Sequence, residues 1–538
     1  MKQRLLLLVF AFCSVMTLNA QRYLTPQFTA VTKTTAIYGQ NFTALTLSVT
    51  GHTLRQPLVC DIYTPTGDVA TARPLVIFIP TGNFLPKSVR RSPTGDRNDS
   101  IAVEMCTRFA KLGYVTASID YRLGWNPIAS QQTDRIYGLI NAAYRGIQDA
   151  RSAVRYFKAN SAALNIDTTK IMVIGEGTGG YIAMGMASLD KYSEILTTQY
   201  PQGKFTIAGA GGSVIPMVIE AYNGNINGTA PDTATRSPQG YPYPLGDTLH
   251  VPNLGSRTSN YALTVNIGGA VGDITWLDAA STPIISIAAP YDLNAPYRDG
   301  VLGVPIGGGV SLPVVNVQGS YLVSLKADTL GINNAFKKLT AAYDPYKSLV
   351  AARNGIYANS SPFTTGVSAA YASGLFPIIG RNTNNDSSTY QWWSKDTTIA
   401  TNKFGLDSAS LAGNPGMSAA KAALYIDSMM TFITPRACVV MNLPCAGLVT
   451  GTEDLLNSST TKLFASPNPS KTAVTFESEV FNPMQAIQLF DLAGRQVFQV
   501  KINSANYTMP RNGLAPGLYV AKVKFEGGIL TKKIVFED

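Results

Sequence analysis

The chain has 538 residues, which exceeds one ordinary domain and is long enough to bury a large core. Only 14% of its residues are charged and 45% are hydrophobic, which argues against a disordered protein. The net charge is +10, but no run rich in lysine or arginine appears, so the composition does not indicate a nucleic-acid-binding protein. The chain has only two histidines, His52 and His250, which limits both metal sites and histidine-based catalysis.

The N-terminus has the order of features that is typical of a secretory signal peptide. Lys2 and Arg4 come first, the apolar run Leu5–Phe12 follows, and Ala20 stands before the expected cleavage point. The apolar run is too short for a membrane span, which needs about 20 residues. We therefore expect residues 1–20 to be a signal peptide, and the alternative is a buried N-terminal helix.

Four cysteines follow the predicted signal peptide. An even number in an exported chain permits disulfides. Cys438 and Cys445 are close in the sequence and form the better candidate pair, whereas Cys60 and Cys106 are equally well explained as small buried hydrophobic residues. No C-x-x-C motif occurs, so a zinc ribbon is not expected.

Residues 21–446 read as alternating strands and helices. Four near-continuous apolar runs are typical of strands that are buried on both faces of a parallel sheet. They are Leu75–Ile79, Val115–Ile119, Ile171–Ile174 and Ile284–Ala288. Helical periodicity appears over Ile101–Leu112, Asp134–Ala163 and Ala419–Ile433. Repeated strand–helix–strand units predict a doubly wound, mostly parallel α/β sheet.

An early hairpin and two insertions are also predicted within residues 21–446. The runs Leu45–Val49 and Pro57–Tyr63 predict an early hairpin before the strand–helix units. Two long stretches rich in Gly, Ser, Asn and Thr, near residues 223–264 and 355–415, predict insertions over the strand ends. Loops of such length are commonly functional or disordered.

The middle of the body carries motifs of a known family. They are Asp120-Tyr121-Arg122-Leu123-Gly124, Tyr144-Arg145-Gly146-Ile147-Gln148-Asp149-Ala150 and Gly175-Glu176-Gly177-Thr178-Gly179-Gly180. From about Asp61 to Leu189 the sequence resembles α/β hydrolases of the carboxylesterase and acetyl-esterase type. The resemblance implies a serine nucleophile on a sharp strand-to-helix turn, followed in the chain by an acid and a histidine.

The sequence departs from that family at the nucleophile turn, residues 175–179, which we call the elbow. This sequence keeps the two glycines of the family pattern G-x-S-x-G, as Gly175 and Gly179, but Gly177 stands in place of the serine. Glycine has no hydroxyl group, so no acyl-enzyme can form at this position. Glycine also relieves the backbone strain of about 1–3 kcal/mol that such a turn imposes on other residues. We expect Glu176 to make a structural hydrogen bond and Thr178 to begin the helix.

The general base is missing as well. Asp292 follows a predicted strand where the family has its catalytic acid, and it is either a vestigial acid or a loop cap. No histidine follows Asp292, and both His52 and His250 precede it. Movement of His250 from its insertion to the elbow would supply a base but still no nucleophile.

The oxyanion loop is altered too. The family motif H-G-G-G-F becomes P-T-G-N-F over residues 80–84. Backbone N–H groups of Gly82 and Thr178 could still face one pocket, so Thr81, Gly82, Asn83 and Thr178 form a candidate oxyanion-type pocket for a carbonyl or carboxylate. The side chains of Thr81 and Asn83 narrow the loop where glycine would permit close approach.

The C-terminal part reads as a separate β module. Residues 447–463 are rich in Thr, Ser, Asn and Gly and predict a linker. Short alternating runs separated by turn signals then predict a small immunoglobulin-like β-sandwich over residues 464–538. The runs are Ala473–Phe476, Ala486–Phe490, Gln496–Val500, Gly517–Phe525 and Ile529–Phe536.

This module resembles the type A C-terminal sorting domain of Bacteroidetes type IX secretion (Por) cargo. The matching residues are Ser466-Pro467-Asn468-Pro469, residues 487–495 (I-Q-L-F-D-L-A-G-R), residues 514–520 (L-A-P-G-L-Y-V) and Lys532-Lys533-Ile534-Val535. The resemblance implies passage across the outer membrane, removal of the domain and exchange for a lipopolysaccharide anchor. The alternative is an ordinary sandwich that binds a ligand.

Together these features predict an exported cell-surface pseudo-hydrolase with a binding, adhesive or surface-structural role. The alternative is an active carboxylesterase or related serine hydrolase with displaced catalytic groups. The expected partners are the type IX secretion machinery and a surface glycan or protein. No cofactor is expected, and no metal either, because Asp273, Asp278 and Asp292 lack a ligand spacing.

Overall fold

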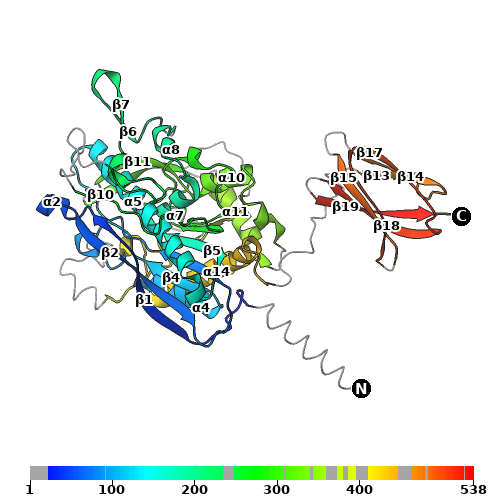
Figure 1. The fold of residues 1–538 in the computed structure, drawn as a ribbon, viewed down its shortest axis with the longest axis horizontal. Coiled ribbons are helices and arrows are strands. Elements are labelled where there is room, and N and C mark those ends of the chain that lie inside the picture. The colour runs from blue at the N-terminus through cyan, green and yellow to red at the C-terminus, as the bar shows by residue number, and fades with distance from the viewer. Residues whose placement is uncertain are drawn as a thin grey trace. The chain divides into compact units, whose positions relative to one another are not determined.

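The computed structural model describes residues 22–538 apart from 91, 200, 234–246, 293, 308–309, 340–342, 359–371, 380–385, 396–409, 446–462, 479–482, 493 and 526–527. The chain forms two compact units, Met1–Leu448 and Val449–Asp538 (Figure 1). The predicted signal peptide lies outside the described residues, as does the predicted linker up to residue 462. Each unit is described by itself.

An eight-stranded sheet with the order β1-β2-β4-β3-β5-β8-β9-β12 forms the centre of the first unit. Its strands are β1 (Val31–Thr43), β2 (Leu54–Pro65), β3 (Arg73–Ile79), β4 (Val115–Ile119), β5 (Ile166–Glu176), β8 (Leu263–Ile267), β9 (Ile284–Ala288) and β12 (Leu375–Pro377). β1 pairs antiparallel with β2 and β2 antiparallel with β4, and all other neighbours are parallel. The predicted doubly wound, mostly parallel sheet is confirmed.

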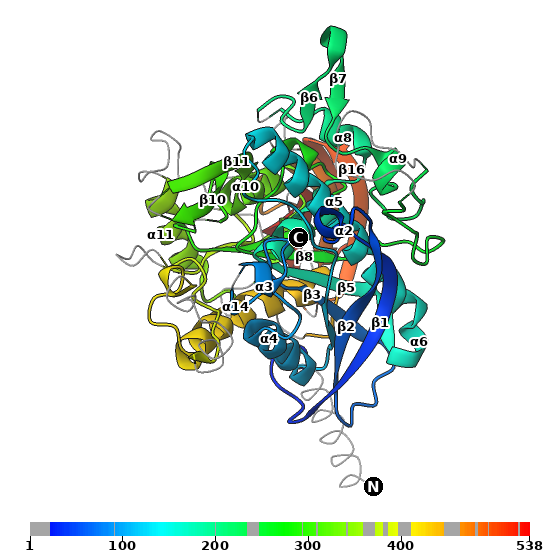
Figure 2. The same cartoon turned by 90° about the vertical axis from the view of Figure 1, so that its left-hand side faces the viewer.

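Helices cover both faces of this sheet, and each face has its own hydrophobic core. Along β3, Leu75 and Ile77 enter the core that contains α5 and α7, whereas Phe78 enters the core that contains α4 and α14. The long helices are α4 (Ser100–Lys111), α5 (Gln132–Ala159), α7 (Thr178–Ser188), α10 (Ser320–Thr329), α11 (Lys347–Ala358) and α14 (Ala419–Val440). Figure 2 shows α4 and α5 on opposite sides of the strands. Burial on both faces explains why the strands read as continuous apolar runs.

The remaining elements of the first unit are short. The helices are α2 (Leu47–Thr50), α3 (Lys87–Arg90), α6 (Ser161–Leu164), α8 (Tyr192–Leu196) and α9 (Glu220–Asn223). Two hairpins are formed by β6 (Thr206–Ala208) with β7 (Val214–Pro216) and by β10 (Asp299–Gly307) with β11 (Val310–Gln318). The predicted helix over residues 134–163 is α5 followed by α6.

The predicted early hairpin is wrong in its first strand. Leu45–Val49 is not a strand, because α2 begins within it and ends at Gly51, which has a left-handed φ of 73°. The partner of β2 is β1. Most side chains of β1 before Tyr38 are exposed or half-buried, as expected for a strand at the edge of a sheet, so apolar alternation does not reveal it.

The prediction that residues 355–415 form an insertion is wrong in part. This range contains β12, which pairs in parallel with β9 as the last strand of the central sheet. β12 has only three residues, which is shorter than the runs by which a strand is recognised in a sequence.

Buried arginines of α5 make hydrogen bonds to the described part of the other predicted insertion, residues 223–264. Arg151 donates to the carbonyl oxygen of Ile226 at 3.0 Å. Arg155 donates to the carbonyl oxygens of Asn227 at 2.7 Å and Asn253 at 2.9 Å. Both arginines are buried, and these carbonyl groups satisfy donors of their guanidinium groups.

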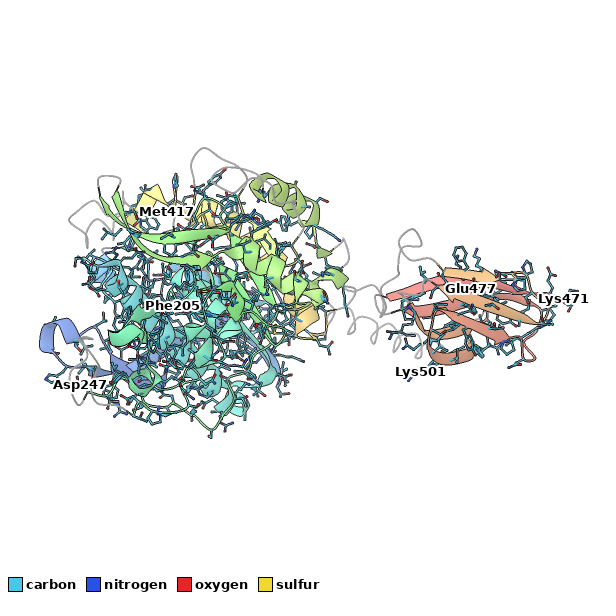
Figure 3. All side chains as sticks on the ribbon, turned by 90° about the horizontal axis from the view of Figure 1, so that it is seen from above. Phe205, Asp247, Met417, Lys471, Glu477 and Lys501 are labelled. Carbon is cyan, nitrogen blue, oxygen red and sulfur yellow. A yellow bond between two sulfur atoms is a disulfide. The ribbon has the colours of Figure 1, made fainter. Side chains whose placement is uncertain are left out.

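The second unit is an antiparallel β-sandwich. One sheet has the order β13-β14-β17 and the other β16-β15-β18-β19, and side chains from both fill one core. The strands are β13 (Leu463–Ser466), β14 (Ala473–Ser478), β15 (Met484–Phe490), β16 (Gln496–Ser504), β17 (Asn506–Pro510), β18 (Gly517–Phe525) and β19 (Gly528–Phe536). The five predicted strands are present, and β13 and β17 are additional. Exposed charged side chains such as Lys471, Glu477 and Lys501 cover its outside (Figure 3).

The predicted disulfide is present. Cys438, near the end of α14, is bonded to Cys445, and their Cα atoms are 6.1 Å apart. Cys60 and Cys106 are free and buried. Within the part of the chain that the structure describes, no helix combines the length and apolar character needed to cross a membrane.

Replacing Arg155 with methionine should destabilise the first unit. The change removes the donors to the part-buried carbonyl groups of Asn227 and Asn253, so we expect the free energy of unfolding to fall by about 2 kcal/mol. The matched control is Lys158→Met on the same helix, where the ammonium makes an exposed hydrogen bond to Thr258 and the loss should stay below about 0.5 kcal/mol. Urea denaturation measures both, and equal losses would contradict the role given to Arg155.

Candidate functional site

The elbow joins β5 to α7 in the middle of the central sheet. β5 ends at Glu176, α7 begins at Thr178, and Gly177 between them has φ 56° and ψ −118°. These angles are strongly unfavourable for residues that have a side chain. The N–H group of Gly177 donates to the carbonyl oxygen of Ile267, at the end of the neighbouring strand β8, at 2.8 Å. The turn is therefore held in the shape that presents a nucleophile in active α/β hydrolases.

The two flanking glycines are required by packing. A Cβ atom on Gly175 would lie 2.0 Å from the carbonyl oxygen of Gly179, and a Cβ atom on Gly179 would lie 1.9 Å from that of Ile79. These neighbours are backbone atoms, which cannot turn aside as a flexible side chain can. Gly175 and Gly179 are thus explained by the close approach of β3, β5 and α7, whether or not the site is catalytic.

The position of the nucleophile is occupied by another residue. A Cβ atom on Gly177 would lie 2.2 Å from Oγ1 of Thr81 and 2.8 Å from its Cβ. Thr81 belongs to the altered oxyanion loop, where the family has glycine. The side chain of Thr81 therefore fills the space into which a serine at residue 177 would project.

The oxyanion loop is closed by internal hydrogen bonds. The N–H group of Thr81 donates to Oε2 of Glu176 at 3.0 Å, and the N–H group of Asn83 donates to Oγ1 of Thr178 at 3.0 Å. The Tyr121 hydroxyl lies 3.1 Å from the same Oγ1 and donates to the Pro80 carbonyl oxygen. Thr81, Asn83 and Thr178 are thus brought together with Gly82, and the N–H groups of Thr81 and Asn83 have acceptors. That the N–H groups of Gly82 and Thr178 face one pocket stays a prediction.

Glu176 links the elbow to a segment that the sequence did not single out. The side-chain amide of Gln391 donates to Oε1 of Glu176, while Oε2 accepts from Thr81. Glu176 is buried, and this desolvation raises the pKa of its carboxyl group to about 8. The expected structural role of Glu176 agrees with these contacts. No local pattern identifies Gln391, because it lies in the stretch interpreted as an insertion.

Asp292 lies four residues after β9, and Tyr390, which follows β12 in the chain, lies nearby. Oδ1 of Asp292 accepts from the N–H group of Asn294 at 2.8 Å, as a loop cap does. A Cβ atom built on Gly268 would lie 3.3 Å from Oδ2 of Asp292 and 2.9 Å from the hydroxyl of Tyr390. Desolvation raises the pKa of Asp292 to about 7. Tyr390 follows the last strand of the sheet, the region in which the family histidine is expected by chain order.

Neither histidine contacts the elbow. His52 is exposed and its Nδ1 lies 3.2 Å from Oδ1 of Asp247. His250 is fully buried, and its Nδ1 accepts from Nδ2 of Asn41 at 3.2 Å and from Nη2 of Arg122 at 3.5 Å. Burial, assisted by the charge of Arg122, lowers the pKa of His250 to about 3, so it is neutral.

The other acidic residues considered as ligands have structural contacts. Asp273 caps the 3-10 helix Ile274–Trp276 and pairs with Lys204 at 3.2 Å, and Asp278 accepts from the N–H group of Ala280 at 2.8 Å. Among the described residues, no group of three His, Cys, Asp or Glu side chains could hold a metal ion.

Two stretches of the chain match known protein families. The BD-FAE family model matches residues 60–209, and the secretion system C-terminal sorting domain model matches residues 465–537. The chain carries a BD-FAE domain and a sorting domain. Both resemblances seen in the sequence are thereby confirmed, and the BD-FAE domain has the α/β-hydrolase fold. The sorting domain indicates secretion and attachment to the cell surface.

Several solved esterase structures are similar to part of the chain. Thermogutta terrifontis esterase 2 phosphorylated by paraoxon is 15% identical over 49% of this chain and 73% of that chain, with a TM-score of 0.27. The same esterase phosphoramylated by tabun has 15% identity, 49% and 74% coverage and a TM-score of 0.28. Pyrobaculum calidifontis esterase in its monoclinic form has 23% identity, 32% and 43% coverage and a TM-score of 0.20. Such TM-scores carry no mechanistic implication. A comparison with curated proteins gives no match.

The buried His250 should make the stability of the first unit depend on pH. Its pKa is about 3 in the folded protein and 6.5 ordinarily, so below pH 6.5 the unfolded chain binds a proton that the folded chain does not. His250→Asn keeps an acceptor for Asn41 and Arg122 but cannot titrate. As the pH falls from 6.5 towards 3, the wild type should lose up to about 1.4 kcal/mol per pH unit relative to this variant.

Urea denaturation at pH 7.5 and pH 5 measures this difference. The matched control is His52→Asn, because His52 is exposed. The control should follow the wild-type profile. A His250→Asn variant with the same pH dependence as the wild type would show that His250 is accessible to protons in the folded protein.

Proposed function

We propose that this protein is a cell-surface binding protein whose BD-FAE domain is a pseudo-hydrolase. The observation that carries the proposal is the contact at the elbow, where a Cβ atom on Gly177 would lie 2.2 Å from Oγ1 of Thr81. A serine at residue 177 would force the Thr81 side chain to move, because its Oγ1 and Cβ lie 2.2 Å and 2.8 Å from the added Cβ atom. The two replacements are therefore compatible with each other, and glycine at residue 177 offers no hydroxyl group for an acyl-enzyme.

The surroundings of Asp292 support the same proposal. The Tyr390 hydroxyl lies near Asp292, and burial raises the pKa of this phenol well above its ordinary value of 10. A phenol in that state does not accept a proton from a serine at neutral pH. No histidine follows Asp292 anywhere in the chain. A nucleophile at the elbow would thus lack a base to activate it.

The alternative is an active serine-hydrolase-like enzyme with displaced catalytic groups. Thr178 is the hydroxyl residue next to Gly177, but it lies at the start of α7, accepts from Asn83 and contacts Tyr121. The Thr178 hydroxyl group is therefore occupied by contacts within the elbow and the loop after β3. We therefore favour a binding role, in which the type IX machinery delivers the protein and a surface glycan or protein is its partner.

The secreted protein should not hydrolyse simple esters. We expect no turnover of p-nitrophenyl acetate above the uncatalysed rate and no labelling by a fluorophosphonate, because no nucleophile stands at residue 177. Gly177→Ser alone should also be inactive. It should lower the free energy of unfolding by about 2–4 kcal/mol, since it adds backbone strain and the clash with Thr81.

The double variant Gly177→Ser/Thr81→Gly is the control for this explanation. It removes the clash but not the backbone strain, so it should recover part of the lost stability and remain inactive without a base. Ester turnover by the wild type or by Gly177→Ser would favour the enzyme alternative. Equal stability of the single and double variants would mean that Thr81 does not occupy the nucleophile position.

Deletion of residues 464–538 should stop export at the periplasm. The deletion removes the sorting domain and leaves the first unit, which has its own cores. Fractionation and surface proteolysis in a type IX-competent host measure the outcome. The control is the full chain carrying Gly177→Ser, which should be exported normally. Surface display of the truncated chain would show that these residues are not the sorting signal.

A further inference from the structure

A groove of about 390 Å³ lies along β1, at the edge of the central sheet. Its lining comes from β1, from β2 and from the segment 251–253, and consists of Ile37, Tyr38, Gly39, Gln40, Arg55, Val251, Pro252 and Asn253. β1 is the first strand of the sheet, so only its β2 side faces another described strand (Figure 2). We call this site the edge groove. Since β2, β4 and β3 separate β1 from β5, the edge groove is distinct from the elbow.

The chain itself covers one part of the β1 edge with a side-chain amide. Oδ1 of Asn253 accepts from the N–H group of Gln40, and Nδ2 of Asn253 donates to the carbonyl oxygen of Gln40, both at 3.0 Å. An amide that bonds to both backbone groups of one residue makes the same pair of hydrogen bonds as a residue of a neighbouring antiparallel strand. The β1 edge therefore pairs with an amide group at this position.

Towards its beginning, β1 has no such cover. Alternate residues of an antiparallel strand direct both backbone groups away from the partner strand. The Val59 carbonyl oxygen accepts from the N–H group of Asp120 on the far side of β2 at 2.8 Å, so Ile37, which is paired with Val59, is directed outward. By alternation, Thr35 and Lys33 are directed outward too. No described residue donates to or accepts from the outward backbone groups of these three residues.

The side chains at this open edge leave the backbone accessible. A lysine that projects over an edge strand is a common protection against strand pairing. The ammonium of Lys33, however, pairs with Asp61 of β2 at 2.9 Å and donates to Asn98 at 3.1 Å. Ile37 is 55% exposed. The open edge thus combines unpaired backbone groups with an exposed apolar side chain.

The lining of the edge groove has a single charged side chain. Arg55 belongs to β2, is exposed and makes no ion pair or hydrogen bond with any described residue. Val251 and Pro252 add half-buried apolar surface to the same lining. A carboxylate is the complement of an unpaired guanidinium group, with which it forms charge-assisted hydrogen bonds. The edge groove therefore favours a segment that carries an acidic residue.

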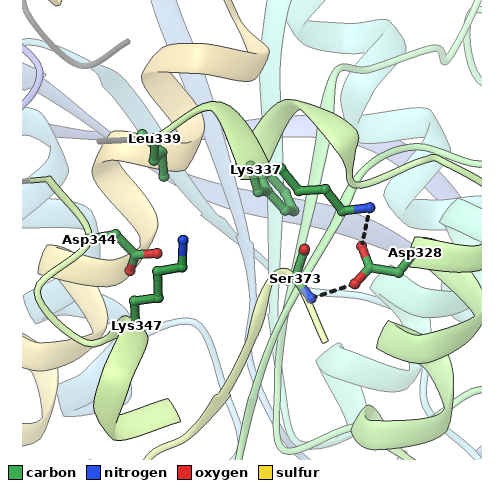
Figure 4. A pocket seen from close by; sticks show the side chains of 7 residues that line it. Asp328, Lys337, Leu339, Asp344, Lys347 and Ser373 are labelled. Carbon is green, nitrogen blue, oxygen red and sulfur yellow. Dashed lines mark hydrogen bonds and ion pairs between the residues drawn. The ribbon is translucent and has the colours of Figure 1, made fainter. Parts of the chain in front are cut away.

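A second cavity of the first unit, about 300 Å³ in volume, differs in this respect (Figure 4). Its two aspartates are held by neighbouring cations. Asp328 pairs with Lys337 at 3.6 Å, and Asp344 pairs with the buried Arg436 at 3.0 Å. These carboxylates are engaged within the fold, whereas Arg55 in the edge groove is available to a partner.

We propose that the open edge of β1 and the edge groove bind an extended acidic peptide segment of a partner protein. The segment adds a strand to the sheet through the outward backbone groups of Lys33, Thr35 and Ile37. One of its apolar side chains packs on Ile37 and Pro252, and a carboxylate pairs with Arg55. The proposal rests on the binding role proposed above and names the kind of partner. It does not depend on the elbow, so its failure is read from peptide binding and that of the pseudo-hydrolase from ester turnover.

Isothermal titration calorimetry on the full secreted chain tests the proposal. The probe is the peptide acetyl-Glu-Thr-Val-Thr-Val-Glu-amide, which is rich in strand-forming residues and acidic at both ends. We expect a Kd of about 0.1 mM or lower. A peptide with lysine in place of both glutamates lacks the charge complementarity, and a probe with methylated backbone nitrogens lacks the backbone donors. Each should bind at least about tenfold more weakly.

Two substitutions then locate the site. Ile37→Glu removes the apolar contact and adds a like charge, so it should weaken binding of the acidic probe by about tenfold or more. Arg55→Glu should weaken it by a similar factor and should strengthen binding of the lysine peptide, because it reverses the charge of the groove. The matched controls are Val69→Glu and Lys338→Glu, which change exposed residues outside the lining. Both controls should bind as the wild type does.

Four results would each overturn the proposal. The first is no binding of the acidic probe at about 1 mM. The second is equal binding of the acidic probe and either the lysine peptide or the methylated peptide. The third is unchanged binding in both Ile37→Glu and Arg55→Glu while the chain stays folded by circular dichroism. The fourth is a dimer in sedimentation velocity that Ile37→Glu abolishes, which would assign the open edge to a second copy of this chain.

Discussion

The elbow depends on direct backbone contact between β3, β5 and the first turn of α7. The Cα atom of Gly179 lies so close to the Ile79 carbonyl oxygen that no side chain fits between them. Because β3 ends at this contact, the loop that follows it is held directly over Gly177. The same contact therefore places the side chain of residue 81 where a side chain of residue 177 would lie. In this chain Thr81 fills that volume and residue 177 is glycine.

Hydrogen bonds of Glu176 join two loops to the elbow, and a third loop nearby is capped by its own aspartate. Glu176 bonds to Thr81 in the loop after β3 and to Gln391 in the loop after β12, while Asp292 caps the loop after β9. Burial raises the pKa values of Glu176 to about 8 and of Asp292 to about 7, so neutral forms are populated near pH 7. Neutral groups are less costly to bury than charged ones, provided that their hydrogen bonds are made.

The sequence predicts the parts of the fold that depend on local pattern. The buried strands β3, β4, β5 and β9 read as apolar runs because both faces of the sheet are covered. The helix α14 begins at Ala419, as predicted, where Ser418 caps it by accepting from Lys421. By contrast, the edge strand β1 and the three-residue strand β12 have too weak an apolar pattern to be recognised.

By itself, the sequence determined that residue 177 has no hydroxyl group and that no histidine follows Asp292. It also determined the order of strands and helices around the elbow and the presence of the sorting domain. Only the tertiary structure decided that Thr81 occupies the nucleophile position, that Gln391 binds Glu176 and that His250 is buried beside Arg122. The partners in the Glu176–Gln391 contact are 215 residues apart. Local periodicity describes neighbours within a few turns, whereas such contacts depend on how β-strands and loops are brought together across the sheet.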